Sequence, residues 1–357
     1  MLAALAEHGD EQVGAAVDHL GLVAELGHRV DHSQHLDDVL DPVEVAAQRL
    51  LHHRDQHQAG GARVLVALLD RHVGAELALD PGARSLAGEI EQVAGALGVH
   101  VVAAGRGHGE DAASQIYVAS KEKAAQELGF TSVIVRLPAA AKQEEIVAKV
   151  HEFNQAANIH GILVQLPLPK HLNEKEILQA IIPAKDADGF HYVNQGKLLA
   201  GEETVLPCTP AGITLMLMQL GLDLTGKHAV VVGRSNIVGK PMAQLLLSML
   251  NMTVTTCHSK TQNLAALVRD ADVLVSATGV RGVVDTKDIK PGAIVVDVGM
   301  HRIDGKLTGD LDLTPVAEKA LYYTPVPGGV GPMTIACLLY NTVKAACAAK
   351  GIPQPEM

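Results

Sequence analysis

Short apolar runs alternate with amphipathic segments along much of the chain. Apolar residues recur at helical spacing between Ser85 and Gly98, which predicts a helix that ends at the glycine. The β-branched runs that follow predict strands, and the more polar stretches between them predict helices. In chain order we expect a strand over 99–104, a helix over 114–128, a strand over 132–137, a helix over 143–157 and a strand from residue 161.

A second alternation begins at residue 227 and contains a glycine-rich turn. The apolar run 227–232 predicts a buried strand, and the turn 233–241 leads into a helix that continues to residue 250. Dinucleotides bind to this arrangement of strand, turn and helix, because the turn and the helix N-terminus bring backbone N–H groups to the pyrophosphate. Further strands are expected over 253–256, 273–276 and 294–298.

The composition changes abruptly near residue 112. The chain has 357 residues, of which 48% are apolar and 19% are charged, as in a soluble globular protein with two or three domains. Residues 1–110 hold 7 Arg and no Lys against 17 Asp and Glu, a net charge of −10, and 11 of the 18 histidines. The remainder holds 22 basic and 23 acidic residues, a net charge of −1. The acidity therefore belongs to one end of the chain. The net charge of −11 for the whole chain argues against nonspecific binding to nucleic acid.

Three interpretations of the atypical N-terminal part stay open. It is an appended acidic, His-rich domain, a divergent form of a normal segment, or non-native sequence such as an out-of-frame extension or a misplaced start. The third interpretation concerns residues 1–79, which would then be disordered or non-native. The pairs His28/His32 and His53/His57 have HxxxH spacing but lack the glutamate of HExxH, so we expect no metal site.

Other bulk features bear on the compartment. No apolar run approaches the roughly 20 residues that span a bilayer, and no signal peptide is recognisable, so we expect no membrane association. The four cysteines are widely spaced and form no CxxC pair. This usage fits a reducing, cytoplasmic setting.

Three polar side chains in the first half of the chain are candidates for a catalytic or binding site. Tyr117 and Lys121 are four residues apart on a predicted helix, so both project from one face. Gln165 follows the apolar strand that begins at Gly161, and ligands of α/β sheets bind beyond the carboxyl ends of strands. Taken alone, such a Tyr–Lys pair is more often a surface feature, and a strand before two prolines is more often a stiff loop.

The segment Lys185–Phe190, KDADGF, predicts a turn with two carboxylates, Asp186 and Asp188. It is too short for an EF-hand loop, so its plainer interpretation is a solvated acidic turn.

The second cofactor strand favours NADP over NAD. In NAD sites this strand normally ends in an acidic residue that binds the ribose 2′-hydroxyl. Here it ends in Cys257-His258-Ser259-Lys260, with no acid, and Arg234 lies on the glycine-rich turn. Hydroxyl groups and cations would bind a 2′-phosphate, which an acid would repel.

The glycine-rich turn 233–239 reads GxSxxxG, so it meets the general GxGxxG fingerprint only in part. The strand ends at Ala277-Thr278-Gly279 and Gly299-Met300 should also line the cofactor site.

Together these segments resemble the bifunctional methylenetetrahydrofolate dehydrogenase/methenyltetrahydrofolate cyclohydrolase family. The motifs that carry the resemblance occur in family order over nearly 245 residues: SQIYVASK (114–121), GILVQLPLP (161–169), KDADGF (185–190), PCTP (207–210), GRSNIVGKPM (233–242), TVTTCHSKT (253–261) and TPVPGGVGPMT (324–334).

The resemblance implies two α/β domains around a cleft, the second a Rossmann-type NADP-binding domain. The folate-binding catalytic domain would take residues 80–210 plus 331–357, and the NADP-binding domain residues 211–330. The resemblance also implies a cytoplasmic homodimer that serves one-carbon metabolism and purine biosynthesis.

The motif match also implies roles for individual residues. Lys121 corresponds to the catalytic lysine, Tyr117 to its neighbour over the substrate, Gln165 to its hydrogen-bond partner and Asp188 to the residue that anchors the pterin. Further folate contacts would be Val164, Leu166, Pro327, Gly328, Gly329, Val330 and Gly331, and NADP contacts would be Gly233, Arg234, Ser235, Ser259, Thr278, Gly279 and Met300.

The implied reaction has two steps. Hydride leaves the methylene carbon of 5,10-methylenetetrahydrofolate for NADP, and water then opens the resulting methenyl cation to 10-formyltetrahydrofolate. The second step needs a proton acceptor and donor but no metal. Alternatives are a dehydrogenase with weak cyclohydrolase activity, or an inactive folate- or nucleotide-binding protein with an aberrant N-terminus.

The chain departs from the family before residue 113. The family has a PAS triplet ahead of the tyrosine, whereas this chain has Ala112-Ala113-Ser114, and the familiar N-terminal helix signature is absent. The run 99–104 only loosely imitates the expected strand. If it could not pair inside the sheet, a buried edge would stay unsatisfied and the domain would be weakened.

Overall fold

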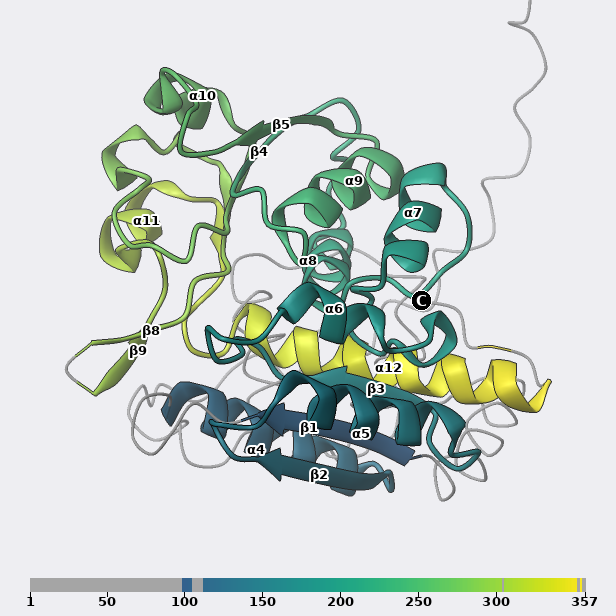
Figure 1. Ribbon diagram of the computed structural model, residues 1–357. Coiled ribbons are helices and arrows are strands. Elements are labelled where there is room, and N and C mark those ends of the chain that lie inside the picture. The colour runs from purple at the N-terminus through teal and green to yellow at the C-terminus, as the bar shows by residue number, and fades with distance from the viewer. Residues whose placement is uncertain (1–97, 105–111, 304, 352–353, 355–357) are drawn as a thin grey trace, which may run out of the picture. The chain divides into compact units, whose positions relative to one another are not determined.

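The computed structural model describes residues 98–104, 112–303, 305–351 and 354 (Figure 1). All of them belong to one unit, Asp41–Met357. The expected helix over 85–97, both HxxxH pairs and the loop 105–111 lie outside the described residues. None of the described helices combines the length and the apolar character needed to cross a membrane.

The first sheet has three parallel strands in the order β2-β1-β3. The strand β1 (Gly98–Ala104) lies in the centre, with β2 (Thr131–Leu137) on one side and β3 (Gly161–Val164) on the other. The atypical N-terminal sequence therefore supplies a strand that pairs along its whole length with β2. The run 99–104 therefore does pair inside the sheet, and the unpaired buried edge that would weaken the domain is not present there.

Side chains of β3 alternate between two apolar clusters, because successive strand residues point to opposite faces. Ile162 and Val164 pack with residues of α5 (Gln143–Gln155) and α6 (Glu174–Gln179), whereas Leu163 packs with residues of two later helices. These are α8 (Cys208–Gln219) and the long C-terminal α12 (Val330–Lys350). Both faces of the strand are covered, which explains its uninterrupted apolar sequence.

The helix α4 (Ala112–Glu127) precedes β2 and packs on α12 through a cluster that includes Ala125 and Val343. The loop from β3 leads through α6 and the 3₁₀ turn η2 (Pro183–Lys185) to α7 (Tyr192–Ala200). In Figure 1, α12 runs in yellow alongside β3. The C-terminal helix therefore returns to the first sheet.

The second sheet has five parallel strands in the order β10-β7-β6-β4-β5. The chain enters at β4, continues to β5 on one side and then crosses back to β6 on the other. This reversal of direction between β4 and β6 is the topological switch point, where dinucleotides bind in doubly wound folds. The strands are β4 (His228–Val232), β5 (Thr253–Cys257), β6 (Val273–Ser276), β7 (Ile294–Asp297) and β10 (Tyr322–Tyr323).

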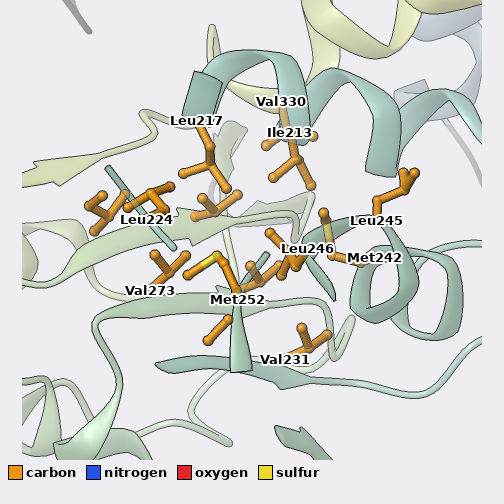
Figure 2. Close-up of a cluster of buried hydrophobic side chains, with 14 of the residues drawn as sticks. Ile213, Leu217, Leu224, Val231, Met242, Leu245, Leu246, Met252, Val273 and Val330 are labelled. Atoms are coloured by element: carbon orange, nitrogen blue, oxygen red, sulfur yellow. The ribbon is translucent and has the colours of Figure 1, made fainter. Parts of the chain in front are cut away.

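Helices cover both faces of this sheet. Val231 of β4 faces a cluster formed with α8 and α9 (Gly239–Met249), whose Met242, Leu245 and Leu246 are fully buried (Figure 2). Val230 faces the opposite cluster, which includes residues of α10 (Leu264–Asp270) and α11 (Leu313–Lys319). The buried residues of these two clusters are aliphatic or sulfur-containing, which fits the scarcity of aromatic residues in the chain.

The expected strands and helices agree with the structure within one or two residues at most ends. The β6 prediction of 273–276 agrees at both ends. Apolar spacing did not reveal the antiparallel hairpin of β8 (His301–Ile303) and β9 (Lys306–Thr308), because three-residue exposed strands carry too short a pattern.

Candidate functional site

The ammonium group of Lys121 lies at the carboxyl end of β3. Lys121 is buried on α4 with 6% exposure, and its Nζ donates a hydrogen bond to Oε1 of Gln165 at 3.3 Å. Gln165 follows β3 directly and shares the alternation of Leu163, so it points toward the face that α12 covers. Its own amide donates to the carbonyl of Leu166 at 2.7 Å, which fixes the orientation of Oε1. The plainer expectation of a surface lysine is wrong.

Tyr117 lies on α4 one helical turn before Lys121. That spacing places the two residues on the same side of the helix. The described part of this residue is its backbone, so its place over a substrate stays a prediction.

The two carboxylates of the turn that follows η2, Asp186 and Asp188, have different surroundings. Asp186 is buried and accepts hydrogen bonds from the backbone N–H groups of Phe190 and His191 and from Nδ2 of Asn194, at 2.8–3.1 Å. Lys185 donates to carbonyls at the end of α5, including those of Asn154 and Ala156, each at 2.8 Å. These two residues hold the turn in place, and the expectation of a solvated acidic turn is wrong.

Asp188 is the carboxylate of this turn that faces Lys121. Its side chain is buried at 8% exposure, and burial raises the pKa of the carboxyl group, while the charge of Lys121 acts to lower it. A hydrogen bond with the thiol of Cys208 also lowers that pKa. Gly189 follows with φ +74, and a side chain there would collide with the backbone of Leu206 and Pro207. The close packing of these two segments therefore requires the glycine.

Asn341 is a site-supporting residue that sequence reasoning missed. From α12, its Nδ2 lies 2.9 Å from the carbonyl oxygens of both Ala187 and Leu206 and 3.4 Å from Sγ of Cys208. Asn341 is fully buried, so these contacts join the turn of Asp188 to the start of α8. An isolated asparagine on an apolar helix gives no sign of this contact, since its partners lie more than 130 residues away.

The segment Pro327–Gly331 leads into α12. Gly328 has φ +93, and a Cβ on Gly329 would overlap the carbonyl of Pro325 and the side chain of Thr324. The paired glycines are therefore required by the backbone path. The peptide bonds before Pro327 and before Pro167, in the loop after β3, are cis.

The glycine-rich turn after β4 approaches its neighbours too closely for side chains. A Cβ on Gly233, which has φ +139, would collide with the carbonyl of Ala277 after β6, and a Cβ on Gly239 would collide with the carbonyl of Gly233. The loops after β4 and β6 therefore touch at the switch point. Oγ of Ser235 accepts hydrogen bonds from the N–H groups of Val238 and Gly239 at 3.1 and 3.3 Å, which orders the start of α9.

The end of β5 presents cationic and hydroxyl groups. β4 and β5 pair up to Val232 and Cys257, so the turns that follow them are neighbours. Arg234, Ser259 and Lys260 are all exposed on these turns, and residues 258–261 include no acid. Nδ1 of His258 accepts from the N–H of Lys260 at 3.1 Å, which shapes the second turn. This donor set suits a phosphate group.

The loops after β6 and β7 complete the switch-point region. Thr278 and Gly279 follow β6, and Met300 follows β7 with 45% exposure. The Cε of Met300 would lie 3.9 Å from a Cβ placed on Gly331, so its side chain reaches the start of α12. In the described part of the chain, no cluster of His, Cys, Asp and Glu could hold a metal ion.

The fold and these strand-end loops define a two-domain α/β protein whose second domain has the architecture of a dinucleotide-binding domain. Models of the tetrahydrofolate dehydrogenase/cyclohydrolase family match residues 83–188 for the catalytic domain and 207–350 for the NAD(P)-binding domain. The chain belongs to this family of folate dehydrogenases and cyclohydrolases.

Curated relatives support the assignment over the same region. The bifunctional protein FolD of Enterococcus faecalis is 56% identical over 240 residues, which cover 67% of this chain and 85% of the relative. That of Cupriavidus necator is 55% identical over 244 residues, which cover 68% and 86% of the two chains.

Solved structures extend the similarity to the three-dimensional fold. The bifunctional FolD enzyme of Campylobacter jejuni has a TM-score of 0.66 at 43% identity and covers 74% of this chain and 96% of its own. The Trypanosoma brucei enzyme, solved with NADP and an inhibitor, has a TM-score of 0.66 at 35% identity and covers 77% and 98%.

Proposed function

We propose that this protein oxidises 5,10-methylenetetrahydrofolate with NADP and hydrolyses the methenyl product to 10-formyltetrahydrofolate. The observation that carries the proposal is the group formed by buried Lys121 and Asp188 with half-buried Gln165, which three separate segments bring together. Family membership supplies the reaction, and this group supplies the polar side chains that the reaction needs.

Lys121 is the residue that we assign to proton transfer. Hydrolysis of the methenyl cation requires removal of a proton from the attacking water and delivery of a proton to the ring nitrogen that leaves. An amine can do both in turn. Gln165 orients the amine through a neutral amide, so it adds no charge that would hold the proton in place. Tyr117, one turn away on α4, would cover the substrate.

Asp188 is the residue that we assign to the pterin. Its carboxylate is buried beside Lys121, and a buried carboxylate binds N–H donors strongly because water does not compete. Val164 and Leu166 flank Gln165, and Pro327, Gly328, Gly329, Val330 and Gly331 form the loop that we assign to the remaining folate contacts.

NADP fits the switch point of the second sheet. Gly233 and Gly239 allow the turn to pack closely against the loop after β6 and against itself, and Ser235 shapes the turn between them. Arg234 and Ser259, together with the nearby Lys260, would bind the 2′-phosphate, while Thr278, Gly279 and Met300 would contact the rest of the cofactor. When bound, the oxidised nicotinamide supplies the hydride acceptor.

We assign the folate-binding domain to residues 80–210 plus 331–357 and the NADP-binding domain to 211–330. Return of α12 to the first sheet supports this discontinuous division. We further propose that the enzyme is a cytoplasmic homodimer.

A spectrophotometric assay tests the function. Purified protein is mixed with 5,10-methylenetetrahydrofolate and NADP, and the absorbance of the methenyl product is followed as it forms and decays. NADP-dependent formation with decay faster than the nonenzymatic rate is the expected result. No turnover by folded protein would contradict the proposal, and formation with only nonenzymatic decay would leave a dehydrogenase without the second activity.

A further inference from the structure

The carboxylate of Asp310 lies between the loops that follow β6 and β7. Its side chain is 1% exposed, and its Oδ2 accepts hydrogen bonds from the N–H of Thr278 at 2.9 Å, from Oγ1 of Thr278 at 2.7 Å and from the N–H of Gly279 at 3.1 Å. The hydroxyl of Ser276, at the end of β6, donates to the same oxygen at 3.3 Å. One oxygen atom thus accepts four donors from a single strand-end loop.

The other oxygen of Asp310 binds the next loop. Nε2 of His301 donates to Oδ1 at 2.7 Å, and His301 directly follows Gly299 and Met300 at the end of β7. A single side chain from outside both loops therefore holds them in a fixed relation. A carboxylate is suited to this because its two oxygens accept several donors at once.

A second buried carboxylate holds Asp310 itself. Oδ1 of Asp297 accepts from the N–H groups of Gly299 and Asp310, each at 2.9 Å, and Oδ2 accepts from the N–H of Leu311 at 2.9 Å. Burial raises the pKa of Asp297, and the nearby Asp310 adds to the rise. A Cβ on Gly299 or Gly309 would collide with these carboxylates, so both glycines are required by the network.

The network is costly by ordinary folding criteria. Two carboxylates that lie side by side away from water repel each other, and an apolar core would hold a loop without that repulsion. The loops that they fix lie at the switch point, where Gly233 abuts Ala277. This location ties the two carboxylates to the placement of the loops at the switch point.

We propose that Asp310 is a positioning residue for the nicotinamide cofactor. It sets the backbone of Thr278 and Gly279 and, through His301, that of Gly299 and Met300, without contacting the cofactor itself. The inference rests on the proposed function, which places NADP against these loops.

The variant Asp310→Asn tests the proposal. An amide replaces one acceptor oxygen with an NH2 donor, which opposes either the N–H groups of Thr278 and Gly279 or Nε2 of His301. Loss of hydrogen bonds to a charged group predicts a KM for NADP that is raised roughly 10- to 100-fold. The KM for 5,10-methylenetetrahydrofolate should not change.

The cyclohydrolase reaction provides an internal control because hydration of the methenyl substrate consumes no NADP. Its rate, measured without nicotinamide, should be unchanged in Asp310→Asn. Asp312→Asn is the matched control. It removes the same charge two residues away, at an exposed position where Asp312 accepts only from the N–H of Thr314 among its described hydrogen bonds, at 3.2 Å.

A second pair of variants covers the case in which Asp310→Asn fails to fold. His301→Gln keeps an N–H donor toward Asp310 and should retain most of the affinity for NADP, whereas His301→Ala should raise the KM for NADP. Equal effects of the two substitutions, or no effect of either, would overturn the proposal.

Three results separate the possible failures. Parallel loss of both activities in Asp310→Asn would mean that Asp310 serves only folding. An unchanged KM for NADP would mean that the loops need no such anchor. If the wild-type protein itself shows no turnover, the proposed function fails, and titration with NADPH by fluorescence then decides whether Asp310→Asn still weakens binding.

Discussion

Nε2 of Gln195 lies 3.0 Å from the carbonyl oxygen of Asn236, to which it donates a hydrogen bond. The same amide lies 3.4 Å from the carbonyl of Phe190. Gln195 belongs to α7, Phe190 follows the turn of Asp188, and Asn236 belongs to the glycine-rich turn. One side chain thus connects the segment that we assign to folate with the segment that we assign to the pyrophosphate.

Replacing Gln195 with Leu should therefore affect the cofactor turn. The substitution keeps the volume but removes the donor to Asn236, and a typical net hydrogen bond changes an equilibrium by about 2- to 10-fold. We expect the KM for NADP to rise by such a factor in steady-state assays. Gln262→Leu, at an exposed position after β5, is the control and should leave the KM unchanged. A wild-type KM in Gln195→Leu would mean that the contact does not order the turn.

Lys121→Met should abolish the cyclohydrolase reaction. Methionine keeps the length of the side chain and removes the group that we assign to proton transfer. Loss of general acid–base catalysis predicts a fall of about 10²- to 10⁴-fold in the rate of methenyl hydrolysis, measured by loss of absorbance. Exposed Lys123 on the same helix provides the control variant Lys123→Met. Full hydrolysis by Lys121→Met would exclude Lys121 as the proton carrier.

Asp188→Asn should change how stability depends on pH. Burial raises the pKa of Asp188 in the folded protein, so its contribution to stability is complete below the unfolded pKa of about 3.9 and is lost as the pH rises through the folded pKa. Asparagine carries no proton, so this loss is absent in the variant. Between acid and neutral pH, the free energy of unfolding of Asp188→Asn, measured with denaturant, should therefore rise relative to that of the wild type. Folate binding should be weakened in the same variant.

Exposed Asp223 provides a control for that experiment, because its pKa is shifted in the opposite direction. Hydrogen bonds from Thr225 lower the pKa of Asp223, so its contribution to stability is present above the unfolded pKa and is lost as the pH falls. Asp223→Asn should accordingly lose stability relative to the wild type as the pH rises. A difference of the same sign in both variants would contradict the assignment of the shift to burial.

Asn341→Leu should destabilise the catalytic half of the protein. The substitution removes the amide donor to the carbonyls of Ala187 and Leu206; Ala187 keeps the thiol of Cys208 as a donor, and an unsatisfied buried group costs about 1–3 kcal/mol. The free energy of unfolding, measured by denaturant titration, should fall by at least that amount. Because Ala187 precedes Asp188, the KM for folate should rise as well. Unchanged stability would show that water replaces the amide.

Ser259→Asp should shift the cofactor preference from NADP toward NAD. An acid at the end of β5 would repel a 2′-phosphate and bind the ribose hydroxyls of NAD. The ratio of kcat/KM for NADP to that for NAD should fall by about tenfold or more, since charge-assisted contacts change binding by 1.5–3 kcal/mol. Ser248→Asp, at an exposed position of α9, is the control. An unchanged ratio would place the 2′-phosphate elsewhere.

The sequence by itself determined β1 to β7, the helices α4, α5 and α9, and the glycine-rich turn, but not α6, α7, α8, α10, α11 or the β8–β9 hairpin. These features depend on local patterns. The run 228–232 is rich in β-branched residues, which favour a buried strand. The GxSxxxG turn needs glycine at positions 233 and 239, where a Cβ would collide with neighbouring backbone. The motifs also singled out Lys121, Gln165 and Asp188 as candidates, because their spacing matches the family over a long stretch.

The tertiary structure decided which of the polar groups act together. Asp186 and Asp188 look equivalent in KDADGF, but one accepts three hydrogen bonds within its own segment and the other faces Lys121 from α4. Asn341 and Asp310 contact groups far away in the sequence, and local patterns carry no information about such contacts. The pairing of β1 with β2 and β3 was also decided by the fold, because a strand's place in a sheet depends on its partners and not on its own residues.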